Sequence, residues 1–174
     1  MYLVIRILTS IIAIAGSMAA ASAQTPVAFE CETTPPATDR PSADVNPFGE
    51  DESVYFEDGI WVSIPEDGVL ELSAERTVTF GNLEGWRTET FTWLRDDGVE
   101  GFVVVSGERL DKPSDLQPQT PLSPQRQYVQ VGTVRTGIAF PDKGCWEVTG
   151  TVGDHSITWV MDVRFGETIA TPVP

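Results

Sequence analysis

The alternation of apolar and polar residues is clearest near the end of the chain. On both sides of Gly153-Asp154 almost every second residue is apolar, and this period of two predicts a pair of strands that each bury one face. With Gly153-Asp154 as a two-residue turn, Trp146 lies opposite Met161 and Val148 opposite Trp159, so both apolar sets share one face. A slip of one residue would turn one set toward water, and the register of this hairpin is therefore well specified.

Shorter segments with the same period are found upstream. Regular structure is expected to begin at Gly59, with one strand, a three-residue hairpin loop at residues 66–68 and a return strand that points Leu70 and Leu72 to the same side as Val62 and Ile64. The continuous apolar run at 102–105 is typical of a central strand covered on both faces. The other predicted strands are 76–80, 86–95, 128–131 and 134–140.

Two proline-rich stretches interrupt the strands. Residues 24–58 are rich in Pro, Asp, Glu and Thr and are expected to form an extended or partly disordered leader. Residues 111–124 carry four prolines and are expected to form a long crossover between two sheets. Because no convincing helical period is present, the chain is predicted to be all-β, with an antiparallel sandwich at 59–166 and a tail at 167–174.

The first 23 residues have the layout of a secretory signal peptide, with Arg6, an apolar core and a cleavage site at Ala21-Ser22-Ala23. An uncleaved membrane anchor is the alternative, but the apolar run falls short of the ~20 residues that a spanning helix needs. We therefore expect an exported protein, in the periplasm, at the cell surface or outside the cell, with no stable membrane insertion after signal cleavage.

The charge of the chain is strongly negative. With Arg6 removed, 10 Lys and Arg face 26 Asp and Glu, so the formal net charge changes from −15 to −16. Such a surface repels phosphate backbones and anionic lipids, which argues against nucleic-acid binding and electrostatic membrane docking. The simplest explanation of this excess of acidic residues is that it keeps the protein soluble. Cation binding is the more specific alternative.

The chain contains two cysteines, Cys31 and Cys145, and in an exported protein an even number predicts one disulfide. That bond would close a loop of more than a hundred residues and stabilise the fold by about 4 to 5 kcal/mol. Lipid attachment at Cys31 is the competing use, but Phe29 and Glu30 stand where a lipobox needs small residues. Because Cys145 has the parity of Glu147, away from the Trp146 face, the bond is expected at the end or outer surface of the sandwich.

The sequence FPDKGCWEVTG at 140–150 is similar to the C-terminal signature of a family of uncharacterised exported bacterial proteins, many of them lipoproteins. Looser matches occur at 60–62, 86–87 and 106–111. The resemblance implies an immunoglobulin-like sandwich of about seven to nine strands that ends in this hairpin, and it implies pairing of Cys31 with Cys145. It implies no activity. The chain departs from the family by lacking a lipobox, which argues against anchoring, and by carrying Glu108 where an arginine is usual.

Catalytic and metal-binding motifs are not found in the sequence. The single histidine, His155, follows directly on Asp154, and consecutive residues at a turn point apart, whereas a catalytic triad converges in space. The acidic residues at 50–52 and 57–58 could bind calcium, but solvated acid is the simpler interpretation because their spacing fits no known loop. We therefore predict no catalytic residue, no metal and no cofactor.

The five tryptophans are the most informative candidates for binding. Trp146 and Trp159 belong to the core by the register of the hairpin, while the positions of Trp61, Trp86 and Trp93 are undecided. Exposed rings could stack on sugars or anchor a protein, so these three are the candidate binding residues. We expect a non-catalytic binding or structural module with an unknown protein or glycan partner. The alternatives are a carbohydrate-binding module and a small hydrolase with two carboxylates about 5 to 10 Å apart.

Overall fold

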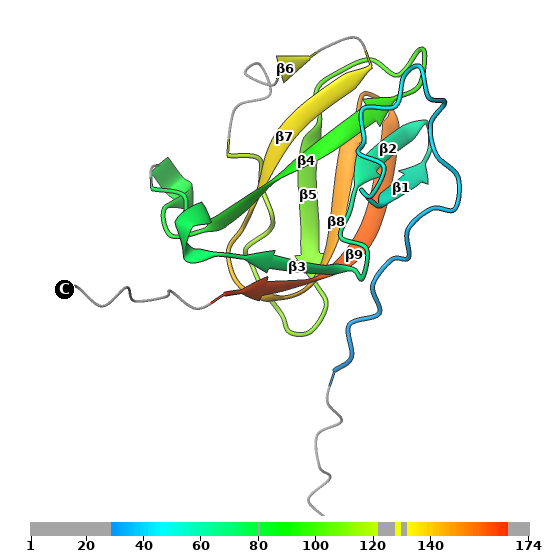
Figure 1. Ribbon diagram of the computed structural model, residues 1–174. Helices are drawn as coiled ribbons and strands as arrows, with labels where there is room; N and C mark the ends of the chain where they lie inside the picture. The colour runs from blue at the N-terminus through cyan, green and yellow to red at the C-terminus, as the bar shows by residue number, and fades with distance from the viewer. Residues whose placement is uncertain (1–28, 80, 122–127, 130–131, 167–174) are drawn as a thin grey trace, which may run out of the picture.

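The computed structural model describes residues 29–79, 81–121, 128–129 and 132–166, with only the backbone of 128 and 129 (Figure 1). The predicted signal peptide at 1–23 and tail at 167–174 lie outside this part of the chain. The described residues form two short 3-10 helices, η1 (Ala74–Arg76) and η2 (Gly81–Leu83), and nine strands. The strands are β1 (Val54–Glu57), β2 (Ile60–Ser63), β3 (Val69–Leu72), β4 (Arg87–Arg95), β5 (Val104–Arg109), β6 (Tyr128–Val129), β7 (Thr133–Phe140), β8 (Gly144–Val152) and β9 (His155–Phe165).

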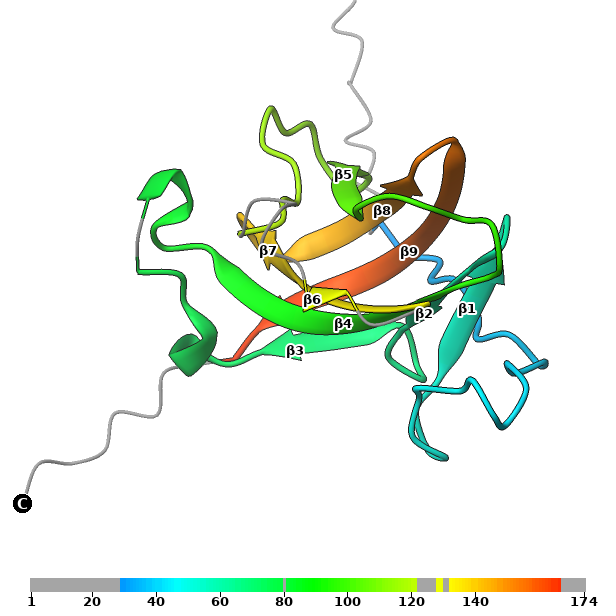
Figure 2. The same cartoon turned by 90° about the horizontal axis from the view of Figure 1, so that it is seen from above.

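These strands form two sheets that pack face to face (Figure 2). One sheet has the order β1-β2-β4-β7-β6 and the other the order β3-β9-β8-β5. In an immunoglobulin fold, strands A, B, E and D face strands G, F and C, and β2, β4, β7 and β6 face β9, β8 and β5 in the same order. The predicted immunoglobulin-like sandwich is therefore confirmed. Among the described strands, only β3 departs from antiparallel pairing, since it runs parallel to β9.

The closing hairpin has the predicted register. Trp146 pairs with Met161 and Val148 with Trp159, and the turn between the strands is Gly153-Asp154. The five side chains predicted to be buried together all lie in the main core, at 1% exposure or less: Trp146, Val148, Ile157, Trp159 and Met161.

Strand β4 supplies the facing half of the core. Phe91 and Trp93 are both buried, and the ring of Trp93 packs edge-on against Trp159 with centroids 5.6 Å apart. In an alternating strand Arg87 lies on the same face as these rings, so the sequence did not show which face of the strand is buried. Its guanidinium lies 4.5 Å above the ring of Phe165 and donates to backbone carbonyls at the end of the sheet, so this charged side chain covers the rim of the core.

The predicted hairpin at 66–68 is wrong. After β2 the chain turns at Pro65 and passes to the other sheet, where β3 pairs with β9 instead of β2. Alternation cannot reveal this change, because Leu70 and Leu72 still point into the same core as predicted. Gly68 has a φ of +70° and lies against Thr33, where no β-carbon would fit, so the turn is shaped by a contact with a distant segment.

Two further strand predictions need correction. Residues 76–80 form no strand among the positions described there; η1 ends at Arg76, and Thr77 makes only an isolated bridge to Arg87. The apolar run at 102–105 is not a central strand, since β5 is the edge of its sheet. Val103 and Val105 are buried, but Phe102 and Val104 are 44% and 53% exposed.

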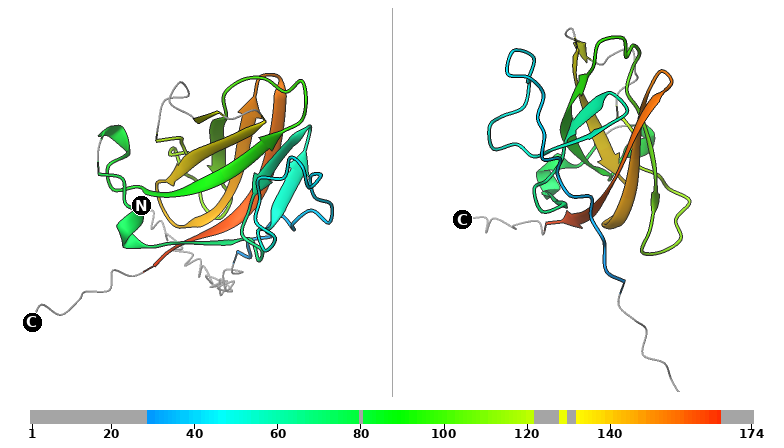
Figure 3. Two further views of the ribbon diagram at one scale, coloured as in Figure 1. Left: turned by 45° about the horizontal axis from the view of Figure 1, so that its top comes forward. Right: turned by 90° about the vertical axis from the view of Figure 1, so that its right-hand side faces the viewer.

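The segment before β2 is part of the fold. Residues 54–57 form β1, so regular structure begins five residues before the predicted Gly59. Phe48 and Val54 pack with Trp61 and Leu94 into a second apolar cluster on the outer face of the five-stranded sheet. Figure 3 shows the leader running past β9 to this face. The described part of the leader is therefore a third layer, because its few apolar residues meet outward-facing apolar residues of β2 and β4.

The described residues contain no helix that is long and apolar enough to cross a membrane.

Candidate functional site

A groove lies between the leader and the loop that joins β4 to β5, and we call it the leader groove. Its volume is about 750 Å³, within the range of small-ligand sites, and it is partly open to solvent. The leader supplies one wall, the β4–β5 loop supplies the other, and Trp61 and Leu94 lie between them. The lining residues are Arg40, Pro41, Ser42, Val45, Trp61, Leu94, Arg95, Asp96, Asp97, Gly98, Val99, Glu100, Gly101 and Gly132.

The wall formed by the β4–β5 loop is fixed by backbone hydrogen bonds. Asp96 donates its amide to the carbonyl of Gly59, and Val99 donates to Asp96 in a tight turn. Gly98 has a φ of +94°, a conformation that glycine adopts without strain. The buried side chain of Val99 joins the main core and holds the loop against the sandwich.

Two arginines line the groove without a carboxylate partner among the described residues. Arg40 donates to the carbonyls of Gly49 and Glu52, and Arg95 donates from Nη1 to the carbonyl of Gly101 at 2.7 Å. The Nε of Arg95 is buried and has no hydrogen-bond partner in the described structure. Because a guanidinium has five N–H donors, both side chains keep unused hydrogen-bonding capacity.

The groove also carries negative charge, on the loop opposite Arg40. Asp96, Asp97 and Glu100 are all exposed. The exposed apolar residue of the leader wall is Val45, at 56% exposure. A ligand in this groove therefore meets guanidinium groups, carboxylates and apolar surface within one site.

The structure places the three candidate tryptophans differently. Trp93 is fully buried, so its selection as a surface-binding residue is wrong. Trp61 is 8% exposed, stacks on Phe56 at 4.3 Å between centroids and belongs to the apolar cluster that contains Phe48, so very little of its ring reaches solvent. Trp86 is half-buried against a small cluster that includes Leu83. Trp61 contributes to the leader groove as a buried support, and the three rings form no exposed strip.

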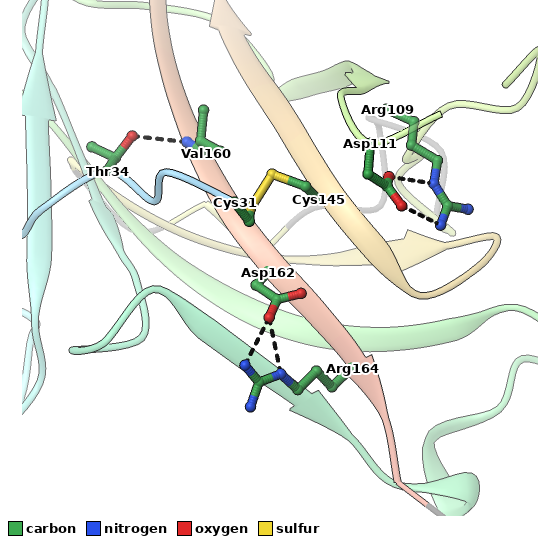
Figure 4. The surroundings of a disulfide bond; sticks show 8 residues. All are labelled: Cys31, Thr34, Arg109, Asp111, Cys145, Val160, Asp162 and Arg164. Atoms are coloured by element: carbon green, nitrogen blue, oxygen red, sulfur yellow. Dashed lines mark hydrogen bonds and ion pairs between the residues drawn. A yellow bond between two sulfur atoms is a disulfide. The ribbon is translucent and has the colours of Figure 1, made fainter. Parts of the chain in front are cut away.

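The predicted disulfide joins Cys31 to Cys145, with Cα atoms 5.5 Å apart (Figure 4). It lies on the outer face of the four-stranded sheet, as the parity of Cys145 predicted. Beyond it, Thr34 donates its amide to the carbonyl of Val160 and accepts the amide of Val160 at Oγ1. The bond thus fastens the leader across the closing hairpin. A disulfide of this kind is typical of proteins outside the reducing cytoplasm.

A cluster of charges surrounds the same end of β8. Arg109 is almost fully buried over the ring of Trp146 and donates to Asp111 at 2.7 Å and to Asp142 at 2.8 Å. The hydrogen bond from Arg109 holds the pKa of Asp111 below its usual range, despite partial burial. Burial opposes ionisation of Asp142, but hydrogen bonds from Arg109 and Lys112 outweigh it and lower its pKa as well. This cluster stabilises the fold and lies apart from the leader groove.

Three of the five acidic residues considered for calcium binding, Glu52, Glu57 and Asp58, make structural contacts. Glu52 accepts the amide of Gly49 and so closes a loop of the leader. Glu57 and Asp58 accept the amides of Thr158 and Ser156 along the outer edge of β9. His155, expected to be an exposed turn residue, is partly exposed and contacts Asp58 at 3.3 Å. These side chains cap the part of β9 that β3 leaves unpaired.

Sequence reasoning missed Arg40 and Arg95. Neither belongs to a motif, and they line one groove only because the leader folds back onto the sheet. Phe48 was the available signal, since a large aromatic residue in an otherwise polar segment indicates a buried contact.

Comparisons with known proteins assign neither a family nor a function to this chain. A scan against models of known protein families finds no match for this chain. A search of curated proteins finds no significant relative. Among solved structures, the chain is similar to a crystal structure of a proposed lipoprotein from Bacillus anthracis, with a TM-score of 0.42 and 10% sequence identity over 67% of this chain and 81% of that chain. The class of protein is therefore defined by its own strand order: a disulfide-bonded, immunoglobulin-like sandwich.

Proposed function

We propose that this protein is an exported, non-catalytic binding module that holds a carboxylate-bearing ligand, in the form of an extended peptide segment, in the leader groove. The observation that carries the proposal is the pair Arg40 and Arg95, which line the groove with guanidinium donors that no carboxylate of the described chain occupies. The net charge of the chain is −15, and yet both arginines line the groove without an ion-pair partner among the residues that the structure describes.

The chemistry of the groove favours a peptide over a sugar. Guanidinium groups bind carboxylates through charge-assisted hydrogen bonds, and the opposite wall offers Asp96 and Glu100 to a positive group of the same ligand. The exposed side chain of Val45 offers an apolar contact. A sugar-binding site would need an open aromatic face, whereas Trp61 is covered on its Phe56 side and by the leader.

Binding of matched peptides tests this proposal. A pool of short N-acetylated peptides is titrated into the protein once with free C-terminal carboxylates and once with amidated C-termini, while backbone amide NMR signals are followed. The acid pool should shift the signals of residues 96–101, and the amide pool should bind more weakly. Arg40→Gln should weaken binding of the acid pool roughly tenfold, the effect of losing one hydrogen bond to a charged group.

The control variant is Arg164→Gln, which removes an exposed arginine that pairs with Asp162 on β9, away from the groove. It should bind the acid pool like the wild type. Equal binding of acid and amide pools, or an equal loss in both variants, would rule out a carboxylate site. Shifts produced by acidic oligosaccharides but not by peptides would point instead to the carbohydrate-binding alternative.

The location of the protein completes this proposal. The signal-like layout of residues 1–23 and the Cys31–Cys145 bond both support export. The bond also joins the two cysteines that the resemblance to exported bacterial proteins implies. Mass spectrometry of the exported protein should find Gln24 at the N-terminus. An N-terminus at Cys31 that carries lipid would contradict both the cleavage site and the disulfide.

A further inference from the structure

We propose a second interaction surface, independent of the leader groove: the outer edge of β5 pairs with the same edge of a second copy of this chain. The pairing is antiparallel and is centred on Gly107, so that two four-stranded sheets join into one continuous sheet.

The first observation is that β5 is an edge strand with outward-facing backbone groups. Leu110 donates its amide to Cys145, and residues alternate along a strand, so the amides of Ser106 and Glu108 also face β8. The amides and carbonyls of Val105 and Gly107 therefore face away from the sheet, and no described segment pairs with them. Such an edge is a template for pairing with another strand.

The other edges of the described structure are occupied or short. The edge of β9 that β3 leaves open is capped by side chains of Glu57 and Asp58 and by Thr34. The leader pairs with β1 through the amide of Ala37 and the carbonyl of Val54. Natural sandwiches protect their edges in these ways, whereas no strand in the part of the chain that the structure describes covers the outer edge of β5.

The second observation is apolar surface beside this edge. On the outer face of the sheet, Val104 is 53% exposed and Leu110 is 36% exposed, and Phe102 continues the same row at 44%. Exposed apolar residues beside the amides of Val105 and Gly107, which no described segment pairs with, are the pattern of a pairing site rather than of a solvated edge.

A second copy fits this edge because the strand is complementary to itself. When Gly107 pairs with Gly107 of the other chain, Val104 lies opposite Leu110 and Ser106 lies opposite Glu108. These are non-hydrogen-bonded pairs, in which side chains approach most closely. Each apolar residue thus meets an apolar residue, and each carboxylate meets a hydroxyl. Because both chains use the same edge, the assembly closes as a dimer.

The dimer should be weak. A six-residue edge buries far less than the ~1,200 Å² of a stable interface, and the chains carry a net charge of −15 each. Self-association should therefore increase with protein concentration and with salt, which screens the repulsion.

Hydrogen exchange of single amides, measured by NMR in dilute protein and at about 1 mM, tests the proposal. Exchange at Val105 and Gly107 should slow in the concentrated sample, whereas exchange at Ser106 and Glu108, which already bond to β8, should not change. Sedimentation velocity over the same range should show a monomer–dimer equilibrium. A monomer throughout, or amides at Val105 and Gly107 that stay equally exchangeable, would overturn the proposal.

Variants test the register. Val104→Glu places a carboxylate diagonal to Glu108 of the other chain and should weaken the dimer about tenfold when both copies carry it. Val45→Glu makes the same change at a comparably exposed valine, 56% against 53%, and should have no such effect. Glu108→Gln should strengthen the dimer. Equal effects of the two valine variants would show that net charge, and not this edge, controls association.

Discussion

The ring of Trp93 lies so close above Gly150 that a β-carbon on Gly150 would be 2.5 Å from two of its ring carbons. Trp93 comes from β4 and Gly150 from β8, the strands that correspond to B and F of an immunoglobulin domain, where antibody domains place their disulfide between the sheets. In this protein the ring of Trp93 packs on Gly150 at the corresponding place between the two sheets. The disulfide, Cys31–Cys145, fastens the leader instead.

Gly150→Ala should therefore destabilise the fold by about 1 to 3 kcal/mol, because the added methyl group must displace a fully buried ring. The measurement is urea unfolding followed by tryptophan fluorescence. Gly49→Ala is the control, since a β-carbon there would meet only the Cβ of Glu52 at 3.9 Å. A Gly150→Ala protein as stable as the Gly49→Ala protein would show that the Trp93 ring can move at low cost.

The ring of Trp159 should be needed for its volume and not for its indole N–H. Trp159→Ala should cost about 3 to 5 kcal/mol, enough to unfold a marginal domain. Because the Nε1 of Trp159 is buried without a described hydrogen-bond partner, Trp159→Phe loses no hydrogen bond and should cost clearly less. Equal losses for Phe and Ala, measured by thermal or urea unfolding, would reveal a polar partner of this ring.

The disulfide should act as a clamp on the leader. Replacing Cys31 and Cys145 together with serine should lower stability by about 4 to 5 kcal/mol, as expected for a loop of this length, and should expose the leader to limited proteolysis. The β-sheet circular dichroism should survive at low temperature, because the main core contains neither cysteine. Complete unfolding on reduction would contradict the clamp, and two free thiols in the native protein would contradict the bond.

The ion pair of Arg109 and Asp111 should make stability depend on pH. Since Arg109 holds the pKa of Asp111 below its usual value of about 3.9, ionised Asp111 stabilises the fold above that value, and the contribution is lost as the pH falls through the lowered pKa. Asp111→Asn should therefore be less stable than the wild type at pH 7, by roughly 1 to 3 kcal/mol.

The difference between these two proteins should shrink as the pH falls below about 4. Chemical unfolding of both proteins at neutral and acidic pH provides the measurement. A difference that persists unchanged in acid would mean that the side chain of Asp111 acts through its shape or its contact with Cys145, and not through its charge.

The sequence predicted correctly those parts of the fold whose structure depends on residues close together in the chain. The β8–β9 hairpin is one, because two patterns and a two-residue turn agree on one register. The path of the chain after β2 could not be predicted in this way, because Leu70 faces the core whether β3 pairs with β2 or with β9. The edge position of β5 was also hidden, since a run of four apolar residues is compatible with a covered strand and with an exposed edge.

The candidate site depends on contacts between segments far apart in the chain. Arg40 and Arg95 approach one groove because the leader folds onto the outer face of the sheet, where Phe48 and Trp61 belong to one apolar cluster. Parity showed that Trp61 points away from Ile60 and Val62, but it could not show what covers it. The composition of the leader indicated an extended segment, and the few apolar residues within it decided where that segment lies.

The bond between Cys31 and Cys145 also determines how the molecule would carry a mechanical load. A pull applied at its two ends passes from Cys31 through the sulfur atoms into Cys145 at the start of β8, and then along β8 and β9. The residues between the two cysteines form a covalently closed loop beside this path and bear no tension. While the disulfide is intact, only the closing hairpin can be drawn out, and the rest of the sandwich cannot be unravelled by force from the ends.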